Sequence, residues 1–377
     1  MPEAGHLDRR ELRSNRRQRR RRVTVVAGSA LLVALVAGGV ALATSAVGGD
    51  DEGTPAHRPP TASTPPAAAT TPSTSSVAST TNVPGTTAAT AAPPPADVDR
   101  RVPVGRWSTD YVDSSRSTSP NGDFAGSPAR DLPTSYWYPA TDDAGTPDRA
   151  HGPYPLVLFV HGYDQTPDFY AALLERWASA GYVVAAPTFP ILSGVPGGAS
   201  HVDYSKLFGD AKFVIDRTLG TGADTPIGGL VDGTRVAAAG HSDGEMVAFT
   251  MGFASCCRVW PFTSVVAMAG DLGYADVDPI RDSGLPILHV METGDEYDPY
   301  PDSLQWDRDH LTPPRWILSL LGATHAPPYT QAGNPYFELV ATTTVDFLDG
   351  TLKKRPDRLD ALTSDVAAAP DLAVLER

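Results

Sequence analysis

Cysteine is nearly missing from this sequence of 377 residues, which has only the neighbours Cys256 and Cys257. A framework of several disulfides is therefore excluded, and the fold must rest on a hydrophobic core. Adjacent Cα atoms lie closer together than those of an ordinary disulfide. We expect both residues to be small buried thiols, and a vicinal disulfide is the lesser alternative.

Positive charge is scarce after residue 22. Residues 1–22 hold nine Arg and three acidic residues, a net charge of +6, so the rest of a chain whose total is -14 carries -20. A protein that binds nucleic acid needs a positive surface to meet the phosphates. The acidic body therefore argues against nucleic acid as a partner.

Charged residues are absent from residues 23–47, a run long enough to cross a bilayer as one helix. The basic residues before it and the acidic residues after it follow the positive-inside rule. We expect residues 1–22 to be cytoplasmic and the rest of the chain to lie outside the cytoplasm. The apolar segment is either a membrane anchor or a signal that is cleaved near Ala41–Ala43.

Large apolar residues are also lacking in residues 48–97, which are dominated by Pro, Thr, Ser and Ala. Such a composition cannot build a core and predicts a disordered stalk. Residues 98–377 then form the only predicted folded domain, and we expect it to be catalytic.

Continuous apolar runs alternate with helical patterns throughout residues 98–377, which predicts an α/β fold. We expect a mostly parallel central sheet with helices on both faces and no large lid. The predicted strands are 132–138, 155–160, 182–186, 234–239, 264–268, 285–291 and 316–321, and the predicted helices are 168–180, 203–219, 336–348 and one within 355–377.

The motif Gly-His-Ser-Asp-Gly at residues 240–244 follows a predicted strand and precedes a helical stretch. This context is typical of a nucleophile elbow, a turn too sharp for bulky side chains on either side of the serine. The positive end of the helix that follows favours a developing oxyanion. Ser242 is therefore the predicted nucleophile.

A serine nucleophile needs a histidine base, which lies after it in the chain in this fold. Three histidines follow Ser242. His289 falls inside a predicted strand and is expected to be a core residue, and His310 falls in a charged stretch. His325 follows the last predicted strand, where its loop can reach the serine, and is the predicted base.

The acid that orients the base should follow the preceding strand. Asp295 is the predicted acid because it stands where strand becomes loop, with Asp298 as the close rival and Glu292 as the more distant one. A metal site in this acidic cluster is a weaker alternative, since the ligand spacing of a calcium loop is missing. We expect no metal and no cofactor.

Hydrogen-bond donors for an oxyanion are expected at two backbone positions. His161-Gly162-Tyr163 follows a predicted strand, and glycine lets that loop curl toward the serine. The predicted donors are the peptide N–H groups of Tyr163 and of Asp243, the residue after the nucleophile.

Together these stretches resemble bacterial α/β-hydrolases, in particular the cutinase-like polyester hydrolases, chlorophyllases and relatives of platelet-activating-factor acetylhydrolase. The resemblance covers most of residues 100–355 and includes FVHGYDQTPDFY, AAAGHSDGE, PILHVMETGDEYDP and LLGATHAPP. It implies a triad of Ser242, Asp295 and His325, with Tyr163 and Asp243 as oxyanion donors.

The predicted function is the hydrolysis of carboxylic esters through an acyl-enzyme, with an ester as the partner and a membrane contact through residues 23–47. Two alternatives stay open. One is an acyltransferase of the cell envelope that uses the same triad, and the other is a catalytically inactive domain that binds at the surface.

Overall fold

The computed structural model describes residues 101–274 and 284–377. The predicted basic segment (1–22), apolar segment (23–47) and stalk (48–97) lie outside these residues. Within the two described ranges, no helix is both long and apolar enough to cross a membrane.

A nine-stranded sheet runs through the domain in the order β1-β2-β4-β3-β5-β6-β7-β8-β9. The six strands from β4 to β8 in this order are parallel, and β1, β2 and β9 run antiparallel to their neighbours. The inner strands are apolar along their length because both faces of the sheet are covered. The strands are β1 Val104–Asp113, β2 Arg130–Pro139, β3 Tyr154–Val160, β4 Val183–Pro187, β5 Val231–His241, β6 Ser264–Met268, β7 Ile287–Glu292, β8 Arg315–Leu320 and β9 Ala373–Glu376.

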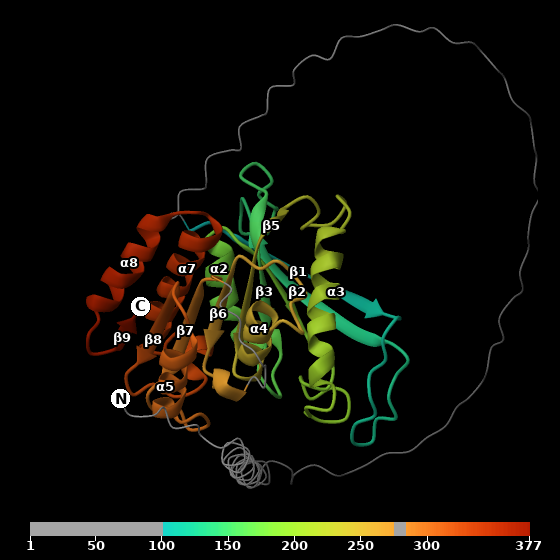
Figure 1. Cartoon of the computed structure of the whole chain (residues 1–377). Helices are drawn as coiled ribbons and strands as arrows, with labels where there is room; N and C mark the ends of the chain where they lie inside the picture. Colours follow the sequence, from blue (N-terminus) through green and yellow to red (C-terminus); the bar gives the residue numbers. More distant parts are fainter. Residues whose placement is uncertain (1–100, 275–283) are drawn as a thin grey trace, which may run out of the picture. The chain divides into compact units, whose positions relative to one another are not determined.

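Helices cover both faces of the sheet (Figure 1). One apolar core joins α2, α7 and α8 to the strands, and a second joins α3 and α4 to the opposite face. The longer helices are α2 Ala171–Ser179, α3 Leu207–Leu219, α4 Asp243–Phe253, α5 Tyr300–His310, α7 Phe337–Leu352 and α8 Pro356–Ala367; α6 Pro327–Thr330 and the 3₁₀ turns η1 Pro167–Tyr170, η2 Tyr204–Lys206 and η3 Leu272–Tyr274 are short. The predicted α/β class with a mostly parallel sheet is confirmed.

The end of the chain differs from the prediction of a single helix within 355–377. After α8 the chain turns back, and β9 pairs antiparallel with β8. Four residues with one buried side chain, Ala373, are too short to reveal a strand by periodicity. Pairing with β9 covers the backbone groups that β8 would otherwise expose at the edge of the sheet.

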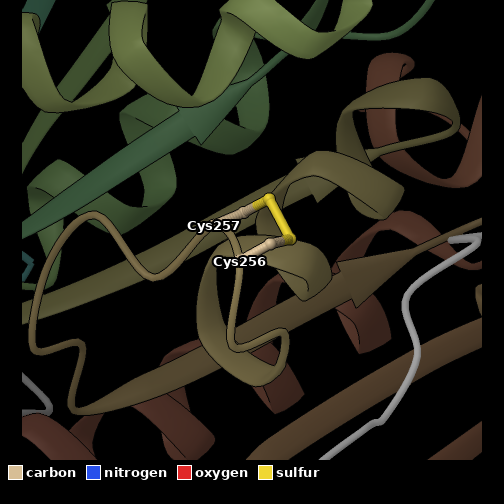
Figure 2. The surroundings of a disulfide bond; sticks show 2 residues. All are labelled: Cys256 and Cys257. Carbon is tan, nitrogen blue, oxygen red and sulfur yellow. A yellow bond between two sulfur atoms is a disulfide. The ribbon is translucent and has the colours of Figure 1, made fainter.

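The prediction for the cysteines is wrong. Cys256 and Cys257 are joined in a vicinal disulfide, and Figure 2 shows it in the segment that follows α4. Cys256 is exposed and Cys257 is half-buried, so neither is a core residue. The pair lies in a turn outside the packed layers, which composition alone cannot locate.

We predicted that the connection between β6 and β7 holds no large lid. Residues 275–283 of that connection lie outside the described residues. The prediction that no large lid covers the site therefore stays a prediction.

Candidate active site

The carboxyl ends of four parallel strands, two on each side of β6, bring the predicted site residues to one edge of the sheet. Gly162 and Tyr163 follow β3, and Ser242 follows β5 at its side. Asp295 follows β7 and His325 follows β8, which pair with each other. This edge is where open α/β sheets place their sites.

Ser242 is the residue between β5 and α4, and its backbone has φ +57° and ψ -127°. A side chain in this region costs on the order of 1–3 kcal/mol, so the surrounding structure must hold it there. The flanking glycines explain how. A Cβ at Gly240 would lie 2.0 Å from the carbonyl oxygen of Gly244, and a Cβ at Gly244 would lie 2.1 Å from that of Val160. Only glycine allows the turn to close.

Three side chains meet in a line of hydrogen bonds. His325 Nε2 lies 2.9 Å from Ser242 Oγ, and His325 Nδ1 lies 2.8 Å from Asp295 Oδ2. Only 9% of the His325 side chain and 4% of the Asp295 side chain are exposed. Because a carboxylate only accepts, Nδ1 carries the proton of the neutral imidazole and Nε2 is free to accept the proton of Ser242.

Backbone N–H groups hold the Asp295 carboxylate in its charged form. Tyr297 and Asp298 donate their peptide N–H groups to Asp295 Oδ1 at 2.7 and 3.1 Å. Burial by itself raises the pKa of Asp295, but His325 and these donors lower it below its ordinary value. The carboxylate is thus anionic and oriented toward the histidine.

The two rival acids have other environments. Glu292 is buried and accepts a hydrogen bond from the Tyr329 hydroxyl. Burial, together with the charge of Asp295, raises the pKa of Glu292 well above its ordinary value. Burial and Asp295 also raise the pKa of Asp298 to about 7. Asp295 is the carboxylate that contacts the His325 ring.

The charges around His325 favour its protonated form. Burial lowers the pKa of His325, but the hydrogen bond to Asp295 and the charges of Asp295, Asp298 and Glu296 raise it above the ordinary 6.5. The half-exposed ring of Tyr297 packs edge-on against the imidazole, with ring centres 4.8 Å apart. This ring covers one side of the base and limits the access of water.

The loop after β3 lies against the nucleophile. A Cβ at Gly162 would stand 3.2 Å from Ser242 Cβ, so the Tyr163 peptide that follows is next to the serine. The Tyr163 hydroxyl donates to the carbonyl of Ala199 at 2.6 Å, which fixes the loop from its outer side.

Asp243 stands on the other side of the serine. It is the first residue of α4, so its N–H has no partner within that helix. The Asp243 carboxylate pairs with the partly exposed His201, whose ring also packs on Tyr163 with centres 4.9 Å apart. The predicted oxyanion donors thus flank Ser242, and their outer surface is polar and aromatic.

One group of potential metal ligands occurs in the described parts of the chain, and it lies in this site. Asp295, Asp298 and His325 each place a ligand atom within 4.8 Å of the others. Both nitrogens of His325 already contact Asp295 and Ser242. A metal ion would have to break one of these contacts, so the donor set fits proton transfer better than metal binding.

Two histidines of the site were not among the candidates from sequence. Both are buried; His241 precedes the predicted nucleophile Ser242, and His161 precedes Gly162 in the loop of the predicted donor Tyr163. Both lie before Ser242 in the chain, whereas the base of this fold lies after the nucleophile. His289, by contrast, is the buried core residue that was predicted, and it bonds to Asp307.

The mostly parallel sheet with helices on both faces is an α/β-hydrolase fold. A family model described as chlorophyllase matches residues 144–278, the segment from before β3 to beyond β6. The resemblance to α/β-hydrolases and chlorophyllases that the sequence indicated is confirmed by this match.

Two individual proteins are similar to this chain. Chlorophyllase-1 from Arabidopsis thaliana is 32% identical over 130 residues, which are 34% of this chain and 36% of the plant protein. The chain therefore covers little more than a third of that relative. The structure of a ferulic acid esterase from Streptomyces cinnamoneus superposes with a TM-score of 0.54 at 21% identity, over 70% of this chain and 94% of that one. This match shows the shared fold.

Proposed function

We propose that this protein hydrolyses carboxylic esters, with Ser242 as nucleophile, His325 as base and Asp295 as the acid that orients the base. The observation that carries the proposal is the unbroken line of contacts from Ser242 Oγ through both ring nitrogens of His325 to Asp295. A purely structural role does not require a strained serine aligned with a histidine and a buried carboxylate. The names of the similar proteins, a chlorophyllase and a ferulic acid esterase, fit the same activity.

The reaction follows from the protonation states. Ser242 Oγ attacks the ester carbonyl while its proton moves to His325 Nε2, and Asp295 stabilises the imidazolium. The N–H groups of Tyr163 and Asp243 stabilise the negative oxygen that forms. The alcohol leaves with the proton from His325. Water, deprotonated by the same nitrogen, then attacks the acyl-serine and releases the acid.

The test is a panel of esters given to the full 377-residue chain. The panel holds chromogenic esters of increasing acyl length, a ferulate ester and chlorophyll, and products are analysed for free acid and for acylated acceptor. We expect free acid as the main product and labelling by a serine-directed phosphonate at Ser242 alone. A folded protein that takes no label and cleaves no ester contradicts the proposal, and acylated acceptor as the main product favours a transferase.

The dependence of kcat/KM on pH is expected to follow the protonation of His325. The neutral imidazole is the active form, so kcat/KM rises with pH through the pKa of this residue and then levels off. Because the surrounding carboxylates raise that pKa, the midpoint should lie above 6.5. It is measured as the rate at low ester concentration across a pH series.

Asp298→Asn tests the cause of this shift. Asp298 has a pKa of about 7, and loss of the negative charge that it carries in its ionised form should lower the pKa of His325 and move the midpoint to lower pH. Asp360→Asn is the matched control, because Asp360 is exposed on α8. An unchanged midpoint in Asp298→Asn, or a move to higher pH, contradicts this account.

We propose further that the catalytic domain acts outside the cytoplasm. The support is the order of segments: basic residues 1–22, charge-free residues 23–47 and a region rich in Pro, Thr and Ser before the domain. Added protease should digest the domain in intact spheroplasts if it is anchored outside. A domain found in the medium points to cleavage of the segment, and a domain that is protected until lysis contradicts the proposal.

A further inference from the structure

Tyr170 and His241 are buried side chains that the proposed reaction does not use, and they lie between three parts of the site. Tyr170 is 0% exposed and His241 is 2% exposed. The Tyr170 hydroxyl lies 3.2 Å from the peptide nitrogen of Gly162 and 2.9 Å from His241 Nδ1. His241 Nε2 lies 3.0 Å from the carbonyl oxygen of His325. The chain of bonds thus runs from the oxyanion loop, past the nucleophile, to the base.

The chemistry of the two ends determines the direction of every hydrogen bond. The His325 carbonyl can only accept, so His241 Nε2 must carry a proton and donate it. The peptide N–H of Gly162 can only donate, so the Tyr170 oxygen accepts there. If His241 is neutral, its Nδ1 is an acceptor, and the Tyr170 hydroxyl donates to it. Each group then has a partner of the right kind, with no proton left over.

The surroundings support the neutral form of His241. Burial and the neighbouring His325 lower the pKa of His241 to about 3. The rings of His241 and His325 are 4.9 Å apart, so a charge on one opposes a charge on the other. His241 therefore stays neutral while His325 gains and loses its proton.

His161 offers an internal contrast. Its Nε2 accepts the peptide N–H of Phe189 at 3.0 Å, and its Nδ1 lies 2.8 Å from the Gly162 carbonyl, which can only accept. His161 thus carries its proton on Nδ1, and His241 carries its proton on Nε2. These two histidines are therefore neutral tautomers of opposite kind.

We propose that Tyr170 and His241 act as positioning residues that hold the oxyanion loop at Gly162 and the loop of His325 in register with Ser242. The proposal rests on the proposed function, because it assigns the two residues a role in that reaction. Neither touches the ester. Their hydrogen bonds keep the donor of the oxyanion hole and the base at the distances that the serine requires, and displacement by about 1 Å can cost about 100-fold in rate.

The kinetic test removes the central hydroxyl. Tyr170→Phe is expected to lower kcat by about 10- to 100-fold, with a smaller change in KM, because the reacting groups lose their alignment while the surface that meets the ester is kept. Tyr182→Phe is the matched control. Tyr182 is also fully buried, and its hydroxyl donates to Asp349. This control should lose stability to a similar degree and keep its kcat.

Two substitutions of His241 separate the two ends of the chain of bonds. The amide nitrogen of Gln takes the place of Nε2, so His241→Gln keeps the donor to the His325 carbonyl and loses the acceptor for Tyr170. The amide oxygen of Asn takes the place of Nδ1, so His241→Asn keeps the acceptor and loses the donor. We expect Gln to retain more kcat than Asn, since it keeps the bond to the base loop. Equal kcat in both variants and in the unchanged chain overturns the proposal.

A spectroscopic test needs neither a variant nor an ester. In the full chain labelled with ¹⁵N at its nine histidines, the ring nitrogens of a neutral histidine report which one carries the proton. His241 is expected as the Nε2–H tautomer that does not titrate around 6.5, and His161 as the Nδ1–H tautomer. A protonated His241, or a neutral His241 with its proton on Nδ1, overturns the proposed chain of hydrogen bonds. Failure of the unchanged chain to cleave any ester instead counts against the proposed function, so the two failures are distinct.

Discussion

Replacement of Ser242 by alanine is expected to lower kcat for ester cleavage by about 10⁶-fold. Alanine leaves the backbone as it is and removes the hydroxyl that lies 2.9 Å from His325 Nε2, so no acyl-serine can form. What remains is the binding of the ester near the oxyanion donors. The measurement is kcat on the best ester of the panel, together with the loss of phosphonate labelling.

Glycine at the same position separates activity from folding. Ser242→Gly should be as inactive as Ser242→Ala but more stable by about 1 kcal/mol, because glycine adopts the positive φ of this position freely and alanine does not. Denaturant unfolding of both variants gives the difference. An alanine variant that keeps more than about a thousandth of the activity would mean that another residue is the nucleophile.

Asp295→Asn is expected to lower kcat by about 10⁴-fold, the second largest effect. A neutral amide cannot stabilise the imidazolium, and its N–H group can force the proton of His325 onto Nε2, where it blocks the serine. Asp298→Asn should lower kcat by less than about 10-fold at high pH. Within the part of the chain that the structure describes, the Asp298 carboxyl makes no hydrogen bond to the His325 imidazole. Both are compared at the plateau of the pH profile.

The comparison between these variants decides which acid serves the base. A greater loss of kcat in Asp298→Asn than in Asp295→Asn would assign the orienting role to Asp298. The backbone donors make this result unexpected. Tyr297 and Asp298 direct their N–H groups at Asp295 Oδ1, and an Asn there would keep its oxygen toward them only by turning its NH₂ to the ring.

Much of the site could be predicted from the sequence because its parts follow apolar strands. Ser242 and His325 each stand at the carboxyl end of a run that was recognisable as a buried strand. In a parallel sheet those ends share one edge, so linear order and strand number were enough to bring the residues together. The role of the glycines around Ser242 was also predictable from the local motif. A Cβ at Gly240 or Gly244 would lie 2.0 or 2.1 Å from a backbone oxygen.

Other features depend on contacts between distant segments. The pairing of Tyr170 with His241 joins residues 71 positions apart, and no pattern near either residue signals it. The short strand β9 exists because β8 offers it an edge. The vicinal disulfide is a local feature by contrast, since it joins adjacent residues in the turn after α4.

The sequence by itself determined the alternation of strands and helices, the position of the proposed nucleophile and the set of carboxylates from which an acid could come, because periodicity and motif spacing are local properties. Only the tertiary structure decided which carboxylate faces His325 and which buried histidines hold the loops. These choices depend on hydrogen-bond directions and burial, and both arise only when segments far apart in the chain are packed against one another.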